Sequence, residues 1–566
     1  MHRILRAVRQ AAVVERRRAV VAGRLIVAIV VGFGVAQGGV AAGARPTSIK
    51  PVQSCNELNG RTFQVRAAAA HVTSAMSVGA ANGHSGYCDV RGTIDPAVGF
   101  ELKLPDTYAG RYLQYGCSGF CGVVYDPALP SCGPSQVGGD FAVASTDDGH
   151  QSQLPGFGSF FDASFAVNQA ARNDFNYRAP HVLAEASKQI IEGYYGASPQ
   201  RSYFNGCSTG GREGLLLAQR YPHDFDGIIA GDPANIADPF YGVYLTWIVR
   251  ANTDAGGAPI LTVDKLQPLH NAVISACDGL DGLVDGQIDD PSACHFDPET
   301  LRCPPGTDQP SCLTPAQIDV VRKLYAGPTD TAGHHLYPGS EPYGSELAWG
   351  GAAVPINGQS VRPLPDNFLK YAAHPIGAPG SSVDTFPFTV DALNGLTQVG
   401  VDGNAMSLDL SAFRRAGGKL IIWHGWADQS IPPAGTLDYY QRLWEHNGGL
   451  RKTQQFARLF MVPAVYHCAQ FAGGYTLNSF DPFPALVDWI EHSDAPDKII
   501  AEQRDAQQNV VRSRPVFPYP LQARYTGSGS VDEAANFVPE LPEGPPHNVI
   551  RWAGDYLYHL AGPIAP

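Results

Sequence analysis

The segment 201–220 constrains the fold of this chain more than any other. Residues 201–205, Arg-Ser-Tyr-Phe-Asn, are a strand candidate that runs straight into the turn Gly-Cys-Ser-Thr-Gly at 206–210. A helix is expected over 211–220, ending before the Tyr-Pro pair that follows. A serine between a strand and a helix is held on a sharp turn, near backbone N–H groups that can stabilise an oxyanion. Ser208 is therefore a candidate nucleophile; a plain glycine loop is the alternative, which the flanking strand and helix disfavour.

Further apolar runs indicate the rest of a sheet. Residues 225–230, 419–423 and 458–462 are typical of strands buried on both faces of a parallel sheet. The stretch 236–412 is different, because it is rich in Gly, Pro, Asn and Asp and has few periodic runs. Insertions at the loop end of an α/β sheet commonly cover the binding crevice. The sequence therefore predicts an α/β fold with a large inserted lid domain.

The first 44 residues are typical of an export signal. Seven arginines precede an apolar run at 25–36, and small residues follow. A membrane anchor is the alternative, but the run is short for a bilayer span. We expect residues 1–44 to be the signal peptide, 45–235 the first part of the catalytic domain, 236–412 the lid, and 413–566 the second part. The protein is then secreted or periplasmic, with no membrane contact after cleavage.

The charge balance limits the kinds of partner. The chain carries 40 Lys and Arg against 53 Asp and Glu, a formal net charge of −13 at pH 7. Removal of the arginine-rich signal makes the mature chain more acidic still. A nucleic-acid partner requires a basic face, so we expect none. Neither a redox nor a nucleotide cofactor is implied.

A serine nucleophile requires a base and a carboxylate that orients it. Asp428 lies on a loop just past the strand candidate 419–423, and His467 follows the candidate 458–462. This gives the chain order Ser, Asp, His found in α/β-hydrolases. His424 is a competing base, but it precedes the acid at the end of a strand, where a structural hydrogen bond is the favoured role. Taken singly, Asp428 is also typical of a loop-capping residue.

The cysteines connect the nucleophile to the base. Cys207 immediately precedes Ser208, and Cys468 immediately follows His467. Because a disulfide brings Cα atoms to about 5.5–6 Å, a Cys207–Cys468 bridge places Ser208 beside His467. All eleven cysteines follow the signal, which favours disulfides over metal binding in an exported protein. A zinc site is the alternative, but the chain has no Cys-x2-Cys pair.

Two stretches around this serine carry a family resemblance. Tyr-Phe-Asn-Gly-Cys-Ser-Thr-Gly-Gly-Arg-Glu at 203–213, with Asp-Phe-Asp-Gly-Ile-Ile-Ala-Gly at 224–231, is similar to the tannase and feruloyl esterase family, which includes mono(2-hydroxyethyl) terephthalate hydrolases. The hallmark of the family is a Cys-Ser, Asp, His-Cys arrangement, matched here by Cys207, Ser208, Asp428, His467 and Cys468. The resemblance extends over nearly the whole chain after the signal. It implies the α/β-hydrolase fold with a lid and a small-molecule aromatic ester as substrate.

The resemblance also implies an oxyanion hole. The N–H of Thr209 supplies one donor, and the second comes from the glycine-rich loop 115–122, where Gly119 matches best. The loop departs from the all-glycine versions by carrying Cys117 and Cys121. A Cys121–Cys132 bridge that leaves Cys117 free is one possibility, and the other pairings of these three cysteines remain open.

An acidic segment in the lid predicts a calcium site. Residues 277–290 contain five aspartates with interleaved glycines, a pattern that suits a hard cation taking six to eight oxygens. No glutamate closes the loop, so it is not an EF-hand, and a solvated acidic turn is the alternative. The resemblance implies a structural Ca²⁺ in the lid, held by the carboxylates and carbonyls of these residues: Asp278, Asp281, Leu283, Asp285 and Gln287.

Three further disulfides are expected: Cys277–Cys294 beside the acidic segment, Cys303–Cys312 next to it, and Cys55–Cys88 near the start of the mature chain. The implied function is a serine carboxylic ester hydrolase that cleaves feruloyl, galloyl or related aromatic esters, such as terephthalate monoesters, as a monomer or homodimer. The alternatives are a peptidase or lipase with the same triad, and a non-catalytic, calcium-stabilised binding protein. Arg362 and Lys370 could pair with a substrate carboxylate, but surface charges are the favoured interpretation.

Overall fold

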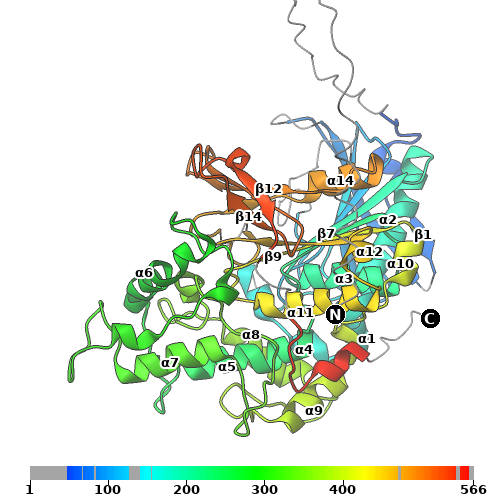
Figure 1. Cartoon of the computed structure of the whole chain (residues 1–566). Coiled ribbons are helices and arrows are strands. Elements are labelled where there is room, and N and C mark those ends of the chain that lie inside the picture. Colours follow the sequence, from blue (N-terminus) through cyan, green and yellow to red (C-terminus); the bar gives the residue numbers. More distant parts are fainter. Residues whose placement is uncertain are drawn as a thin grey trace, which may run out of the picture. The chain divides into compact units, whose positions relative to one another are not determined.

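A mixed sheet forms the centre of the part of the chain that the computed structural model describes, namely residues 48–66, 68–81, 85–126, 141–154, 156–469, 473–542 and 548–559. These residues give a ten-stranded sheet in the order β1-β2-β3-β4-β6-β5-β7-β8-β9-β10 (Figure 1). The expected signal, 1–44, lies outside them. Within the described ranges, no helix is long and apolar enough to cross a membrane.

The sheet has an antiparallel half and a parallel half. The antiparallel half comprises β1 (Thr62–Val65), β2 (Ala68–Val78), β3 (Tyr87–Ile94) and β4 (Val98–Pro105). The parallel half comprises β5 (Arg111–Tyr115), β6 (Phe141–Thr146), β7 (Arg201–Cys207), β8 (Gly227–Gly231), β9 (Lys419–Gly425) and β10 (Ala457–Val462). The parallel strands are almost completely buried, as expected for strands covered on both faces.

Helices cover the two faces of the parallel half. The helices packed against strands of the sheet are α2 (Ala179–Tyr195), α3 (Thr209–Arg220), α11 (Pro433–His446) and α14 (Phe483–Glu491). Two short helices lie next to them along the chain: α1 (Gln169–Asn173) precedes α2, and α12 (Leu450–Thr453) contacts α11. Neighbouring side chains of β7 point to opposite faces. Phe204 packs against Phe225, with ring centroids 5.6 Å apart, whereas Tyr203 packs against Phe483 of α14 at 5.7 Å. The sheet is therefore the middle layer of three.

A long insertion separates the neighbouring strands β8 and β9. Its helices are α4 (Ala237–Pro239), α5 (Leu245–Ala251), α6 (Leu266–Cys277), α7 (Pro315–Ala326), α8 (Pro363–Asn367), α9 (Val390–Gly400) and α10 (Ser411–Arg415), mostly green in Figure 1. Two small sheets follow the main one along the chain: β11 (Ser479–Phe480), β12 (Ile499–Arg504) and β13 (Val510–Val516), then β14 (Gln522–Tyr525) and β15 (Phe537–Glu540).

The register of the parallel strands aligns their carboxyl ends. Cys207 of β7 pairs with Gly231 of β8, and Gly231 pairs with Trp423 of β9. Gly425 at the end of β9 pairs in turn with Val462 at the end of β10. The segments that follow these strands therefore leave the same edge of the sheet, and that edge is where ligands bind in open α/β folds.

Candidate active site

Ser208 lies in the first of these segments, between β7 and α3. Its backbone has φ 64°, a region that non-glycine residues adopt rarely and that recurs at functional sites. Gly206 permits the turn, since a Cβ there would lie 2.3 Å from the carbonyl oxygen of Gly210. The N–H of Ser208 donates to the carbonyl of Gly231 at 3.0 Å, which anchors the turn to β8.

Asp428 and His467 lie together at the same edge. The Nδ1 of His467 is 2.8 Å from Oδ2 of Asp428. The other carboxylate oxygen, Oδ1, accepts the N–H groups of Ser430 and Ile431 at 2.7 and 2.8 Å. Asp428 is fully buried, and these bonds fix its carboxylate toward the imidazole. The structure thus brings the predicted acid and base into direct contact.

Asp428 and His467 each stabilise the charged form of the other. Burial alone raises the pKa of Asp428, but the neighbouring His467 and His424 outweigh it and hold that pKa well below its usual range. Burial likewise lowers the pKa of His467, but the carboxylates of Asp428 and Asp232 outweigh it and raise that pKa above its ordinary value. An imidazole in this setting accepts a proton readily.

A disulfide joins the nucleophile turn to the histidine loop. Cys207 and Cys468 are bonded, with their Cα atoms 6.0 Å apart and 261 residues between them in sequence. Ser208 follows Cys207, and His467 precedes Cys468, so the bridge restrains both residues at once. This is the pairing that the cysteine positions indicated.

The other disulfides agree with the sequence analysis except in one loop. The bridges expected outside this loop are all present: Cys55–Cys88, Cys277–Cys294 and Cys303–Cys312. The suggested Cys121–Cys132 bridge is wrong, because Cys121 is bonded to Cys117. The loop turns back on itself through Gly119 and Cys121, which have φ 58° and 61°, and this brings the two cysteine Cα atoms to 5.5 Å. Cys132 itself lies outside the described residues.

The loop that carries Gly119 is docked on the first turn of α3. The hydroxyl of Thr209 donates to the carbonyl of Gly119 at 2.7 Å, and the N–H of Gly210 donates to the carbonyl of Cys117 at 3.0 Å. Among the described residues, the N–H groups of Gly119 and Thr209 have no hydrogen-bond acceptor. Two unpaired donors next to the nucleophile are what an oxyanion hole requires.

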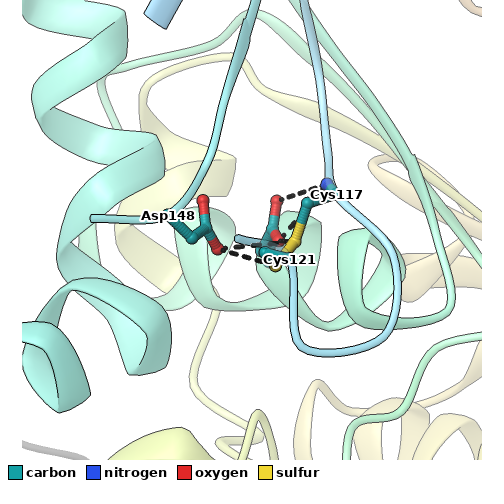
Figure 2. Close-up of side chains that lie close together, drawn as sticks. Cys117, Cys121 and Asp148 are labelled. Carbon is teal, nitrogen blue, oxygen red and sulfur yellow. Dashed lines mark hydrogen bonds between the residues drawn. A yellow bond between two sulfur atoms is a disulfide. The ribbon is translucent and has the colours of Figure 1, made fainter. Parts of the chain in front are cut away.

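Two buried acids lie behind this loop. Figure 2 shows the Cys117–Cys121 bridge with Asp148 directed toward it, and one oxygen of Asp148 lies 3.4 Å from the sulfur of Cys121. Glu213 of α3 accepts the N–H of Cys117 at 3.4 Å. Burial raises the pKa of both carboxyl groups, and for Asp148 the charge of Glu213 adds to the effect. Sequence reasoning missed both acids, although Glu213 stands within the family motif.

His424 has the structural role that its position indicated. Its Nδ1 lies 2.8 Å from the hydroxyl of Thr436, and its Nε2 lies 2.8 Å from the carbonyl of Ile431 and 3.2 Å from Asp428. It is fully buried behind the acid. Of the two lid cations considered for substrate binding, Arg362 pairs with acids of the lid itself, at 3.0 Å in the case of Asp366.

The acidic segment of the lid folds around Asp278. Its carboxylate accepts the N–H groups of Asp285, Gly286 and Gln287 at 3.0–3.2 Å. Asp278 is buried and Asp281 is exposed, while Oδ1 of Asp285 is buried without a hydrogen-bond partner among the described residues. Buried carboxylates and an unpaired anionic oxygen on one tight loop fit a hard cation.

Two arginines also face this loop. Arg512 and Arg514 of β13 both approach Asp285, and Arg514 is almost completely buried. Neither arginine was predicted to lie here, because both are more than two hundred residues further along the chain. Their charges neutralise part of the acidic segment.

The buried parallel sheet, the serine turn and the Asp428–His467 pair define an enzyme of the α/β-hydrolase type. Comparison with known proteins identifies the family within this class. The family model described as tannase and feruloyl esterase matches residues 81–539, and the chain belongs to this family. Its members named in the comparisons are carboxylic ester hydrolases, and so is this protein.

Individual relatives cover most of the chain. A mono(2-hydroxyethyl) terephthalate hydrolase from Piscinibacter sakaiensis is 32% identical and aligns with 81% of this chain and 85% of its own length. A probable feruloyl esterase B-1 from Aspergillus flavus is 31% identical over 77% of this chain and 82% of its own length. The crystal structure of feruloyl esterase B from Aspergillus oryzae superposes with a TM-score of 0.71 at 26% identity, covering 83% of this chain and 97% of that one.

Proposed function

We propose that this protein is a secreted serine esterase that cleaves esters of aromatic acids through an acyl-enzyme. The observation that carries the proposal is the linkage of nucleophile and base: His467 is hydrogen-bonded to Asp428 at 2.8 Å and tied to the Ser208 turn by the Cys207–Cys468 disulfide. The disulfides favour an oxidising compartment, which supports export.

The proposed mechanism follows from the contacts of the imidazole. Because Nδ1 of His467 is engaged by Asp428, Nε2 is the nitrogen that takes the proton of Ser208 as its hydroxyl attacks the ester carbonyl. The N–H groups of Thr209 and Gly119 stabilise the oxyanion. His467 then gives its proton to the leaving alcohol, and water hydrolyses the acyl-enzyme in the same way.

The proposed specificity of this protein for esters of aromatic acids is inferred from the names of similar proteins. The names of those compared include a terephthalate monoester hydrolase and feruloyl esterases, whose acids are aromatic. The direct test is a panel of methyl ferulate, methyl gallate, chlorogenate and mono(2-hydroxyethyl) terephthalate. The proposal expects kcat/KM for at least one of these to exceed that for an aliphatic methyl ester of similar size. Equal or lower values for all four contradict the aromatic assignment.

The Gly119 loop yields a prediction about the oxyanion hole. A Cβ at Gly119 would lie 2.5 Å from the Phe160 ring, and φ is 58°. Gly119→Ala must therefore displace the loop and its N–H, and we expect kcat to fall about 100-fold. The control is Gly60→Ala, which has a similar φ of 71° but open space around the Cβ and is remote in sequence. Equal kcat for both folded variants would contradict the role of Gly119.

We propose that the acidic lid segment holds a structural Ca²⁺. Asp278, Asp281 and Asp285 would supply carboxylates, and Leu283 and Gln287 carbonyls. The ion would neutralise the segment and brace the lid, with no part in the reaction.

Removal of calcium is expected to destabilise the lid. A chelator should lower the Tm by about 5 °C, measured by calorimetry, and added Ca²⁺ should restore it. Asp281→Asn should lose this response. Asp254→Asn, which alters an exposed lid turn outside the ligand set, should keep it. A wild-type Tm that responds to neither chelator nor Ca²⁺, in protein that contains no metal by elemental analysis, contradicts the site.

A further inference from the structure

Asp232 is a buried acid at the edge of the sheet to which the mechanism above gives no role. It follows Gly231, the residue of β8 that pairs with both β7 and β9. Asp232 therefore emerges between the nucleophile turn and the strand that leads to Asp428. Its side chain is fully buried, and its φ of 36° is one that side-chain-bearing residues rarely adopt.

Its carboxylate binds the two chain segments that carry the base and the acid. Oδ2 accepts the N–H of Cys468 at 2.6 Å, and Oδ1 accepts the N–H of Gly425 at 2.8 Å. Cys468 directly follows His467, and Gly425 begins the loop of Asp428. The same carboxylate lies 3.5 Å from the sulfur of Cys207, so it touches both halves of the bridge.

Three residues around this carboxylate have strained backbone conformations. Ser208, Asp232 and Cys468 have φ values of 64°, 36° and 47°, and all three are non-glycine residues. Such conformations persist only where surrounding contacts enforce them, and they recur at functional sites. The two short hydrogen bonds that Asp232 accepts, from the N–H groups of Gly425 and Cys468, are contacts of this kind.

Asp232 also adds a negative charge beside the catalytic histidine. Side-chain atoms of Asp232, Asp428 and His467 all lie within 4.8 Å of one another. Burial and the charge of Asp428 raise the pKa of Asp232 to about 6, while the charge of Asp232 favours the protonated form of His467. His424, whose Nε2 is 3.8 Å from Asp232, is the other titratable group packed here.

The lid places further groups near Asp428. Glu341, Tyr337 and Tyr244 are buried, and the pKa of each is raised by burial, with a further contribution from the charge of Asp428. Burial therefore disfavours the charged forms of these three lid groups, whereas Asp232 lies within 4.8 Å of both Asp428 and His467.

We propose that Asp232 is a positioning residue: a second carboxylate that holds the His467 and Asp428 loops together and stabilises the imidazolium formed when Ser208 loses its proton. It acts through backbone N–H groups and through space, and it touches no substrate. The inference rests on the triad proposed above. His467 would then be supported by two carboxylates, those of Asp428 and Asp232, whereas a triad provides one.

The test is the pH profile of Asp232→Asn, measured as kcat and KM from about pH 5 to about pH 9. We expect kcat to fall about tenfold with KM nearly unchanged, since the interaction strengthens in the transition state. Removal of the charge lets His467 stay neutral to lower pH. The acid limb of kcat/KM should therefore move down by about one pH unit.

A second variant and a matched control separate charge from packing. Asp232→Ser leaves an oxygen acceptor without the charge, so it should move the acid limb in the same direction if Asp232→Asn does not fold. Asp438→Asn alters another buried carboxylate that accepts a backbone N–H, that of Ile550 at 2.9 Å, and has no contact with the triad. It should lower the Tm and leave the acid limb in place.

Two results would overturn the inference: an acid limb at the wild-type pH in a folded Asp232 variant, or an undiminished kcat. If Ser208→Ala is inactive while either result is obtained, the triad stands and the role of Asp232 is wrong. If Ser208→Ala keeps its activity, the triad itself is wrong, and the inference about Asp232 fails with it.

Discussion

Replacement of Ser208 with alanine is expected to lower kcat/KM for an aryl ester by about 10⁴-fold or more, while the chain stays folded. The hydroxyl is the proposed nucleophile, so its removal takes away the group that forms the acyl-enzyme. The backbone should tolerate the change, because the turn depends on Gly206 and on the N–H of Ser208 rather than on the side chain.

The matched control for this prediction is Ser202→Ala. Ser202 is a buried serine at the other end of the same strand, β7. Its loss should change kcat/KM by no more than about twofold. A Ser208→Ala protein with a normal Tm and substantial esterase activity would show that the nucleophile lies elsewhere.

Loss of the Cys207–Cys468 bridge is expected to damage both activity and stability. The double substitution Cys207→Ser/Cys468→Ser frees the histidine loop from the nucleophile turn, and we expect kcat to fall about 10- to 100-fold. In the loop-closure model, a bridge across 261 residues stabilises the fold by about 5 kcal/mol, so the free energy of unfolding should fall markedly.

A second bridge provides the comparison. Cys303→Ser/Cys312→Ser removes a lid disulfide across nine residues and leaves the triad untouched. It should cost less stability and little kcat at 25 °C. Equal kcat in the wild type and the Cys207/Cys468 double variant would contradict the assignment of His467 as the bridged base.

Local pattern was sufficient to predict four of the six parallel strands, β7 to β10, but not β5 and β6. The run at 419–423 became β9, Lys419–Gly425, and the run at 458–462 became β10, Ala457–Val462. Both strands lie in the middle layer, so their apolar runs are nearly continuous. The antiparallel half was not predicted, because β2 begins with alanines, which are depleted in strands and give no local signal.

Asp428 was predictable because it follows a buried strand in the chain order of α/β-hydrolases, and His467 because its neighbour Cys468 pairs with Cys207. Asp232 was not, since its importance lies in hydrogen bonds to Gly425 and Cys468, each about two hundred residues away in sequence. Arg514 was missed for the same reason, as its partner Asp285 belongs to the lid. Contacts between distant segments depend on the register of the sheet, which no single stretch of sequence encodes.

The most direct test of the linked nucleophile and base is a non-reducing peptide map after labelling with an aryl fluorophosphonate, which traps an activated serine. We expect a stoichiometric label on Ser208, in a peptide joined through Cys207–Cys468 to the peptide that contains His467. Reduction should separate the two peptides. A label on another residue, or a labelled Ser208 peptide without the His467 peptide attached, would contradict the linkage of nucleophile and base.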